Sequence, residues 1–213
     1  YSGRPDAEVQ DKKLAAAAML DNNMISALDY YQRAATYDRT DAEALIYAED
    51  LRIEIQNAPY VTIVLGLPLD SSADDLSISR PDLQSVYVFQ HRVNSNNLLP
   101  QGLKLRILIA NSGASATDVA SVAQFIANRV QIGNLEHIVG VVGWPKSSET
   151  INAISVLTAA KIPLISQTAS STALNSISSF FFRVNPNDTA QGNADGKIAY
   201  NQLNARNVLV LRD

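Results

Sequence analysis

Apolar and polar residues follow two different patterns along the chain, and the pattern changes near Pro59. Before this point, residues 6–57 contain no proline or glycine, and residues 24–37 place their apolar side chains on one helical stripe. Alanine is abundant there and favours helix because it loses no side-chain entropy on folding. We predict helices over residues 7–20 and 24–37, followed by a third.

Polar residues set the limits of these helices. Asp21-Asn22-Asn23 ends the first, because such side chains prefer local hydrogen bonds to helix continuation. Thr40 is expected to begin the third, since Glu43 three residues later completes the spacing of a capping box. The third helix is expected to turn five apolar side chains inward, namely Ala44, Leu45, Ala48, Leu51 and Ile55.

After Pro59, short β-branched runs alternate with helical stretches. The expected strands are residues 61–67, 103–110, 137–142, 162–166 and 207–211. The expected helices are residues 81–93, 117–131, 148–160 and 189–203, with Pro81 in a first turn and Ser115 as a cap. This alternation implies right-handed crossovers and a parallel sheet covered on both faces, so the predicted fold class is α/β.

Composition narrows the functional classes. The chain has 213 residues, 46% hydrophobic and 18% charged, which supplies enough apolar surface for a sizeable core. Its net charge of −4 offers no basic surface to nucleic acid. It has no run of 18 apolar residues and no cysteine, which excludes a membrane span, disulfides, thiolate metal sites and a cysteine nucleophile. The N-terminus lacks a basic-then-apolar pattern, so we expect that any signal peptide has already been removed.

Polar loops follow the first four expected strands. In an open parallel sheet, ligands bind beyond the carboxyl ends of the strands, where loops lead into helix N-termini. These loops are rich in hydroxyls, small residues and backbone N–H groups, and they span residues 68–72, 111–115, 143–148 and 167–172. They suit a polar or anionic ligand and suit acid–base or nucleophilic chemistry poorly.

No enzyme or cofactor motif fits the chain. It lacks the G-x-S-x-G of a nucleophile elbow, the G-x-x-x-x-G-K-[ST] of a phosphate loop and the G-x-G-x-x-G of a dinucleotide site. His91 and His137 are expected in a helix and at the start of a strand, away from the polar loops. The acidic pair Asp74-Asp75 is expected to be solvated. We therefore predict a protein that is not an enzyme, with no cofactor and no metal.

Trp144 directly follows an expected strand and allows two interpretations. Its indole is either a stacking platform for a ligand or a plug for the top of the core. The sequence favours neither over the other.

Three segments of the second part carry a recognisable pattern: VVGWPKSSETINAISVLTAAKIPLISQTASSTAL (Val141–Leu174), FFFRVNPNDTAQG (Phe180–Gly192) and NVLVLRD (Asn207–Asp213). They resemble the first lobe of a type I periplasmic solute-binding protein, specifically the branched-chain amino-acid receptors of ABC importers. That family shows Val-Gly-Pro-x-x-Ser, Gly-Ile-Pro-x-Ile-Ser, a Thr/Ser-rich loop and Phe-Arg-x-x-Pro-x-Asp-x-x-Gln-Gly in this order. A looser match reaches back to Val61.

This resemblance implies a Rossmann-like parallel-sheet lobe and a site on it. In the family, a serine at the start of the helix after the third strand and a Thr/Ser loop hold the ligand carboxylate. The ligand-binding candidates that the resemblance implies here are Ser147, Ser148, Thr168, Ala169 through its backbone and Ser170, with Trp144 as the candidate platform. Helix N-termini and hydroxyls that converge on one anionic group agree with this assignment.

Two departures from the family pattern concern the ligand. Asp70 stands where the family usually has threonine, and it would repel a carboxylate that reached it. Lys146 lies in a segment where the family has small residues, and it either attracts a more acidic ligand or faces solvent.

The N-terminal part also resembles a known repeat. Ala27, Tyr31 and Ala34, followed by a turn before Ala42, resemble the second helix of a tetratricopeptide repeat leading into the next. At most one and a half repeats are present. A short helical hairpin packed on its neighbour and a peptide-binding groove therefore both stay open.

The expected organisation is a helical, tetratricopeptide-like extension over residues 1–58, a first lobe over 59–205 and the start of an otherwise missing second lobe over 206–213. The resemblance implies an extracytoplasmic receptor that binds an amino acid or similar carboxylate between two lobes for an ABC permease, with a membrane anchor outside this sequence. The alternative is a ligand-sensing module of a signalling or transcription-regulatory protein, whose helical extension would contact a protein partner.

Overall fold

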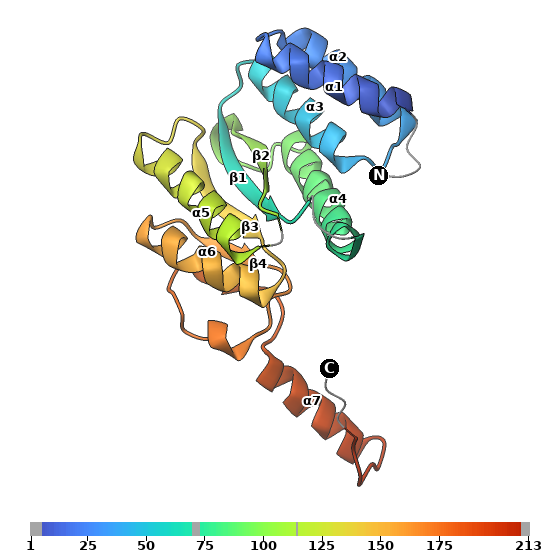
Figure 1. Ribbon diagram of the computed structural model, residues 1–213, viewed down its shortest axis with the longest axis vertical. Coiled ribbons are helices and arrows are strands. Elements are labelled where there is room, and N and C mark those ends of the chain that lie inside the picture. Colours follow the sequence, from blue (N-terminus) through green and yellow to red (C-terminus); the bar gives the residue numbers. More distant parts are fainter. Residues whose placement is uncertain (1–5, 70–72, 114, 210–213) are drawn as a thin grey trace.

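The computed structural model describes residues 6–69, 73–113 and 115–209, which form three parts along the long axis of the molecule (Figure 1). Three helices stand at one end, an α/β body lies in the middle, and one helix projects from the other end. The candidate ligand-binding residues lie in the α/β body.

The N-terminal helices are α1 (Asp6–Leu20), α2 (Met24–Tyr37) and α3 (Ala42–Ile55). The first two have the predicted limits to within a residue. The predicted cap of the third is wrong, because Asp41 accepts from the Ala44 amide while Thr40 donates its amide and hydroxyl to Asp38. A carboxylate at the cap is also favoured by the positive end of the helix.

Helix α3 is buried on two sides. Ala44, Ala48 and Leu51 pack with α1 and α2, as predicted. Ile46, outside the predicted set, is fully buried against the sheet and α4, whereas Ile55 is exposed. The second buried side joins the helical part to the α/β body.

Five parallel strands form one sheet in the order β2-β1-β3-β4-β5. They are β1 (Tyr60–Leu67), β2 (Lys104–Asn111), β3 (Ile138–Gly143), β4 (Leu164–Ser166) and β5 (Phe181–Arg183). Strands β1 to β4 confirm the first four predicted strands, whereas β5 was not predicted. Residues 207–209 of the last predicted strand lie outside any strand, and the rest of that strand falls outside the described residues.

The remaining helices are α4 (Ala73–Ser95), α5 (Ala116–Gln131), α6 (Ser147–Ala159) and α7 (Asp188–Asn201). Helices α5 and α6 cover one face of the sheet, where Val64, Val141 and Leu164 are buried. Helix α4 lies on the other face and begins eight residues before the predicted start, so Pro81 lies inside it and not in its first turn.

The expected cover of both faces holds only in part. On the α4 face, Leu65, Val142, Ile165 and Phe182 are neighbours in register across four strands. Leu65 is 1% exposed beneath α4, whereas Ile165 and Phe182 are 39% and 53% exposed. The described helices therefore leave β4 and β5 largely uncovered on this side.

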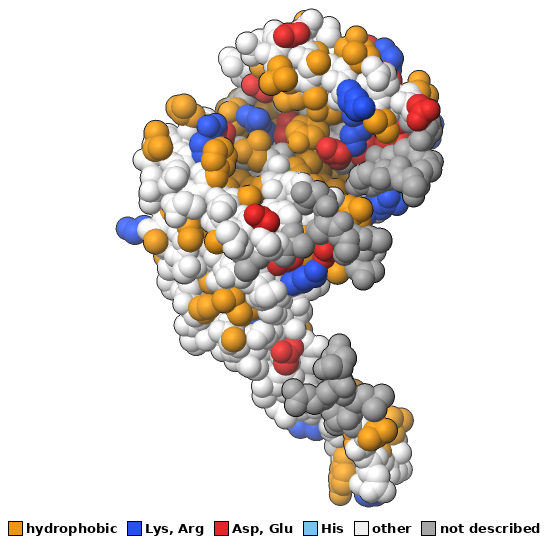
Figure 2. All heavy atoms as spheres, in the orientation of Figure 1, with side chains coloured by type: hydrophobic (Ala, Val, Ile, Leu, Met, Phe, Trp, Pro, Cys, Tyr) orange, Lys and Arg blue, Asp and Glu red, His pale blue; other side chains and the backbone are white. Residues whose placement is uncertain are grey.

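The surface agrees with the charge pattern of the sequence. Acidic and basic side chains are interspersed on the face shown in Figure 2, without a broad basic area. Among the helices that the structure describes, none has the length and apolar character required to cross a membrane.

Candidate functional site

The loops that follow β3 and β4 meet at the carboxyl end of the sheet. Because these strands are adjacent and parallel, their C-terminal loops leave the sheet at the same edge. The β3 loop leads into α6, whose first residue is Ser147. The β4 loop makes a turn over residues 167–171, called the ligand turn below, before the short 3₁₀ helix η2 (Thr172–Leu174).

Two hydrogen bonds join these loops. The Ser171 amide donates to Ser147 Oγ at 3.1 Å, and the Thr168 hydroxyl donates to the Pro145 carbonyl at 2.8 Å. The structure therefore brings Ser147 and the ligand turn together. Ser148 follows in the first turn of α6 and is exposed.

Part of the predicted donor set is engaged within the protein. The Thr168 hydroxyl donates to Pro145, and Ala169 is buried with its amide donating to Ser166 Oγ at 3.3 Å, whereas Ser147 Oγ acts as an acceptor. By contrast, the amides of Ser147, Ser148 and Ser170 donate no hydrogen bond to any residue that the structure describes. These three N–H groups are the backbone donors that the site offers to an anionic ligand.

Trp144 fills the space beneath the two loops. Its side chain is fully buried, and its indole N–H donates to Ser112 Oγ at 3.0 Å. The ring packs on Gly66, where a Cβ atom would lie 2.7 Å from it. A buried side chain whose only polar atom is bonded presents no surface to a ligand, so the structure favours the plug and removes Trp144 from the candidate ligand contacts.

The backbone around Trp144 is tied to both neighbouring elements. Its carbonyl accepts from the Thr150 hydroxyl of α6 at 2.8 Å and from the Ser166 hydroxyl of β4 at 3.2 Å. Gly143 before it has φ +125°, and a Cβ there would lie 2.2 Å from the Gly66 carbonyl oxygen, so only glycine fits. These contacts therefore fix the backbone at Gly143 and Trp144, directly beneath the two loops.

Two buried carboxyl groups beside the site both contact Lys146. Lys146 forms an ion pair with Asp75, which is 3% exposed, so the prediction of a solvated Asp75 is wrong. Glu149 is also buried; its Oε2 accepts from the Lys146 amide at 3.4 Å, and burial raises the pKa of its carboxyl. Asp70 lies outside the described residues.

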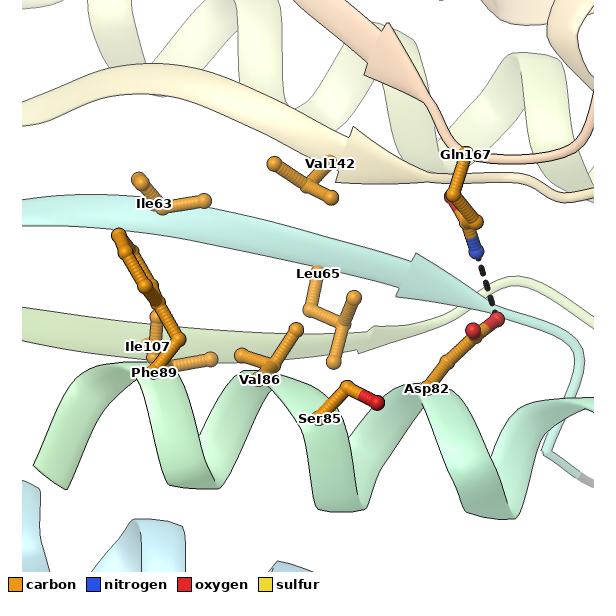
Figure 3. A pocket seen from close by; sticks show the side chains of 9 residues that line it. All are labelled: Ile63, Leu65, Asp82, Ser85, Val86, Phe89, Ile107, Val142 and Gln167. Carbon is orange, nitrogen blue, oxygen red and sulfur yellow. Dashed lines mark hydrogen bonds between the residues drawn. The ribbon is translucent and has the colours of Figure 1, made fainter. Parts of the chain in front are cut away.

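An apolar groove of about 250 Å³ runs between α4 and the sheet (Figure 3). Its apolar walls are Ile63, Leu65, Val86, Phe89, Ile107 and Val142. At the end nearest the ligand turn, Gln167 Nε2 donates to Asp82 Oδ2 at 2.6 Å, and burial raises the pKa of the Asp82 carboxyl. This bond links α4 to the first residue of the turn.

The two histidines each contact a tyrosine outside the two loops of the site. His91 stacks on Tyr87 within α4, and His137 packs edge-on against Tyr60. Within the described residues, no group of three or more His, Cys, Asp or Glu side chains is arranged to hold a metal ion.

The sequence that forms this site matches a known protein family. The sequence profile of the receptor family ligand binding region matches residues 83–202, which is more than half of the chain. The chain belongs to this family. The region matched to the receptor family contains both loops of the site, from α6 to the ligand turn. No curated protein matches the chain in sequence.

Solved structures share the fold of this receptor-family chain. They include leucine binding protein LivK from Thermotoga maritima, with 18% identity and a TM-score of 0.51. The branched-chain amino acid transporter substrate binding protein LivJ from Streptococcus pneumoniae, in complex with isoleucine, has 20% identity and a TM-score of 0.56. An ABC transporter substrate-binding protein from Desulfitobacterium hafniense, in complex with Leu, has 22% and 0.56.

Each of these matches covers only part of this chain and part of the solved structure. They extend over 67–68% of this chain, which in turn spans 38–39% of the length of those three proteins. They establish the type I periplasmic-binding lobe fold for the α/β part of the receptor-family chain.

Two further residues, outside the predicted set, touch the ligand turn. Arg183 and Asn185 both donate hydrogen bonds to backbone carbonyls of the turn. Both belong to the FFFRVNPND segment that carries the family pattern. Their contacts depend on the pairing of β5 with β4, which the sequence did not predict.

Proposed function

We propose that this chain is the ligand-binding part of a solute receptor that holds a small carboxylate or amino acid at the carboxyl edge of the sheet. The observation that carries the proposal is the hydrogen bond between the Ser171 amide and Ser147 Oγ. It places the N-terminus of α6, with its open amides, directly beside the turn that carries the open Ser170 amide.

Binding at this site needs hydrogen bonds and charge but no covalent chemistry. The ligand carboxylate would accept from the Ser147, Ser148 and Ser170 amides, and the positive end of the α6 dipole favours its charge. A hydrogen bond to a charged group contributes about 1.5–3 kcal/mol. We therefore propose a binding protein and not an enzyme.

A second lobe would complete this site. Helix α7 leaves the body next to the ligand turn, and none of its residues is buried. We place the start of the second lobe at α7, ahead of the boundary at residue 206 that the sequence predicted. Closure of two lobes about a hinge would enclose the ligand outside the cytoplasm, and an ABC permease in the membrane would recognise the closed form.

The solved structures indicate which ligands to test first. The Streptococcus pneumoniae protein is a complex with isoleucine, and the Desulfitobacterium hafniense protein is a complex with Leu. Aliphatic amino acids are therefore the leading probes, with simple carboxylates beside them.

A ligand-sensing module of a signalling or regulatory protein is the second candidate. The attachment of α1–α3 favours it, because α3 packs on the sheet and fixes the helical part to the lobe. A helical part fixed in this way would transmit a change in the lobe to a protein partner. The sequence encoded before Tyr1 separates the two candidates: a lipoprotein signal favours the receptor, and a kinase or DNA-binding segment favours the sensor.

Thermal unfolding with a panel of ligands tests the proposal. L-leucine, L-isoleucine and acetate are the probes, with glucose as the uncharged control. A ligand at 100 times its Kd stabilises the folded chain by about 2.7 kcal/mol, which raises the melting temperature. We expect a shift with at least one amino acid or carboxylate and none with glucose.

A proline substitution identifies the amide that carries the binding. Lys146 has φ −84° and ψ 138°, which permits proline at the next position, and Ser147 is the first helical residue. Ser147→Pro removes both the N–H and the hydroxyl, whereas the matched Ser147→Ala removes only the hydroxyl. We expect a smaller ligand-induced shift in Ser147→Pro than in Ser147→Ala. Equal shifts, or no shift with any probe in the unmodified chain, would contradict the proposed site.

A further inference from the structure

The carbonyl side of the ligand turn is held by the segment that leads from β5 into α7. Asn185 Nδ2 donates to the Thr168 carbonyl at 3.0 Å. Arg183 Nη1 donates to the carbonyls of Ser170 and Ser171 at 3.3 and 3.1 Å. One segment therefore donates hydrogen bonds to three of the five backbone carbonyls of the turn, those of Thr168, Ser170 and Ser171.

The Thr168–Ala169 peptide group is fixed on both sides. Its carbonyl accepts from Asn185, and its N–H donates to Ser166 Oγ at 3.3 Å. Because a peptide group is planar, partners on its carbonyl and on its N–H fix its orientation.

The Ser170–Ser171 peptide group is fixed in the same way. Its carbonyl accepts from Arg183 and, at 2.9 Å, from the first amide of α7, while its N–H donates to Ser147 Oγ. Between the two fixed groups, the Ala169–Ser170 peptide makes no hydrogen bond to any described residue. Its neighbours hold it in place, and its N–H remains available.

We propose that Arg183 and Asn185 are positioning residues that hold the ligand turn so that the Ser170 N–H is presented to the anionic group of the ligand. This inference rests on the proposed function for the ligand and on the hydrogen bonds above for the positioning. Neither side chain contacts the ligand in this account.

The chemistry of Arg183 suits this role. Its guanidinium donates to two carbonyls and to Asn175 Oδ1, and no described carboxylate forms an ion pair with it. A planar guanidinium reaches several acceptors in fixed directions, which the single ammonium of lysine does not. Arg183→Lys therefore keeps the charge and loses most of the geometry.

Amide hydrogen exchange of the unliganded chain, measured by NMR, tests the positioning directly. Arg183→Met is expected to raise the exchange rate of the Ser171 amide by about tenfold, with a smaller rise in Arg183→Lys. Asn185→Ala is expected to raise exchange at Ala169 instead. The matched control is Arg206→Met, since Arg206 is exposed beyond α7 and donates to carbonyls outside the turn.

Amides in the buried part of α6, at Ile154 and Leu157, separate local from global effects. The proposal requires that they exchange as slowly in the variants as in the unmodified chain. Unchanged exchange at Ser171 and Ala169, or an equal rise in α6, would overturn it. Should Arg183→Met fail to fold, Asn185→Ala and Arg183→Lys give the same decision.

Titration with L-leucine and acetate, followed by NMR, supplies the second arm. Where the unmodified chain binds a probe, Arg183→Met should bind it about tenfold more weakly and Arg206→Met equally well. Equal affinity in Arg183→Met would overturn the positioning role. If no probe binds the unmodified chain while the exchange rates change as expected, the proposed function fails and the positioning of the turn stands.

Discussion

Helices α3 and α7 both flank the α/β body, and they are attached to it in opposite ways. Helix α3 is buried on two sides, through Ile46 toward the sheet and Leu51 toward α2, whereas no residue of α7 is buried. The described hydrogen bonds from α7 to the body lie at its start, beside the ligand turn. This difference in burial shows that α3 packs as part of the α/β body, whereas α7 extends away from it.

The attachment of α3 is polar as well as apolar. Strand β2 is an edge strand, and its outer backbone groups need partners. Asp50 Oδ1 of α3 accepts from the Ile107 amide at 3.2 Å and from Gln90 Nε2 at 2.6 Å. Asn94 Oδ1 of α4 accepts from the Leu105 amide at 2.7 Å. Side chains of α3 and α4 together thus supply partners for the outer backbone groups of β2 at Leu105 and Ile107.

The largest expected effect concerns the charge of Asp50. Burial raises the pKa of its carboxyl from 3.8 to about 7, against the opposing effects of Arg106 and the two hydrogen bonds. The stabilising contribution of the protonated carboxyl is therefore fully present below pH 4 and is lost as the pH rises through 7. At about 1.4 kcal/mol per pKa unit, the loss reaches about 4 kcal/mol.

Urea unfolding of the unmodified chain and Asp50→Asn between pH 4 and pH 8 measures this effect. Asparagine keeps the acceptor oxygen and does not titrate, so the stability of the unmodified chain relative to Asp50→Asn should fall as the pH rises. If stability changes with pH in the same way in both proteins, the pKa of Asp50 is not raised by its burial between α3 and the sheet.

The next effect compares the apolar contacts of the two helices. Ile46→Ala leaves a cavity between α3, α4 and the sheet and should lower the free energy of unfolding by about 3 kcal/mol. Ile198→Ala on α7 makes the same change at a side chain that is 44% exposed, and should cost less than about 0.5 kcal/mol. Equal costs at the two positions would contradict the distinction between an integrated and a departing helix.

Much of this fold was predictable because its signals are local. The alanine run marked α1, a helical stripe of apolar side chains marked α2, and β-branched runs marked the first four strands. Ile46 was missed because α3 carries apolar side chains on two faces, so no single stripe marks its contact with the sheet. Pro81 resembled a helix start, although α4 continues through it, and β5 is too short to give a pattern.

The candidate site was predictable in outline for a topological reason. Parallel neighbouring strands bring their C-terminal loops together, and this places Ser147 beside the ligand turn. The state of each donor depends on packing that no local pattern encodes. The burial of Trp144, the bonded amide of Ala169 and the carbonyl contacts of Arg183 are of this kind.

We propose above that the open amides of α6 and the ligand turn bind an anionic group. The most direct test is a ¹H–¹⁵N NMR titration of the unmodified chain with L-isoleucine, L-leucine and acetate, because it detects millimolar binding residue by residue. We expect the largest chemical-shift changes at the Ser147, Ser148 and Ser170 amides, with a smaller change at the Trp144 indole N–H beneath them. Changes confined to the apolar groove at Val86 and Phe89, or none with any probe, would contradict it.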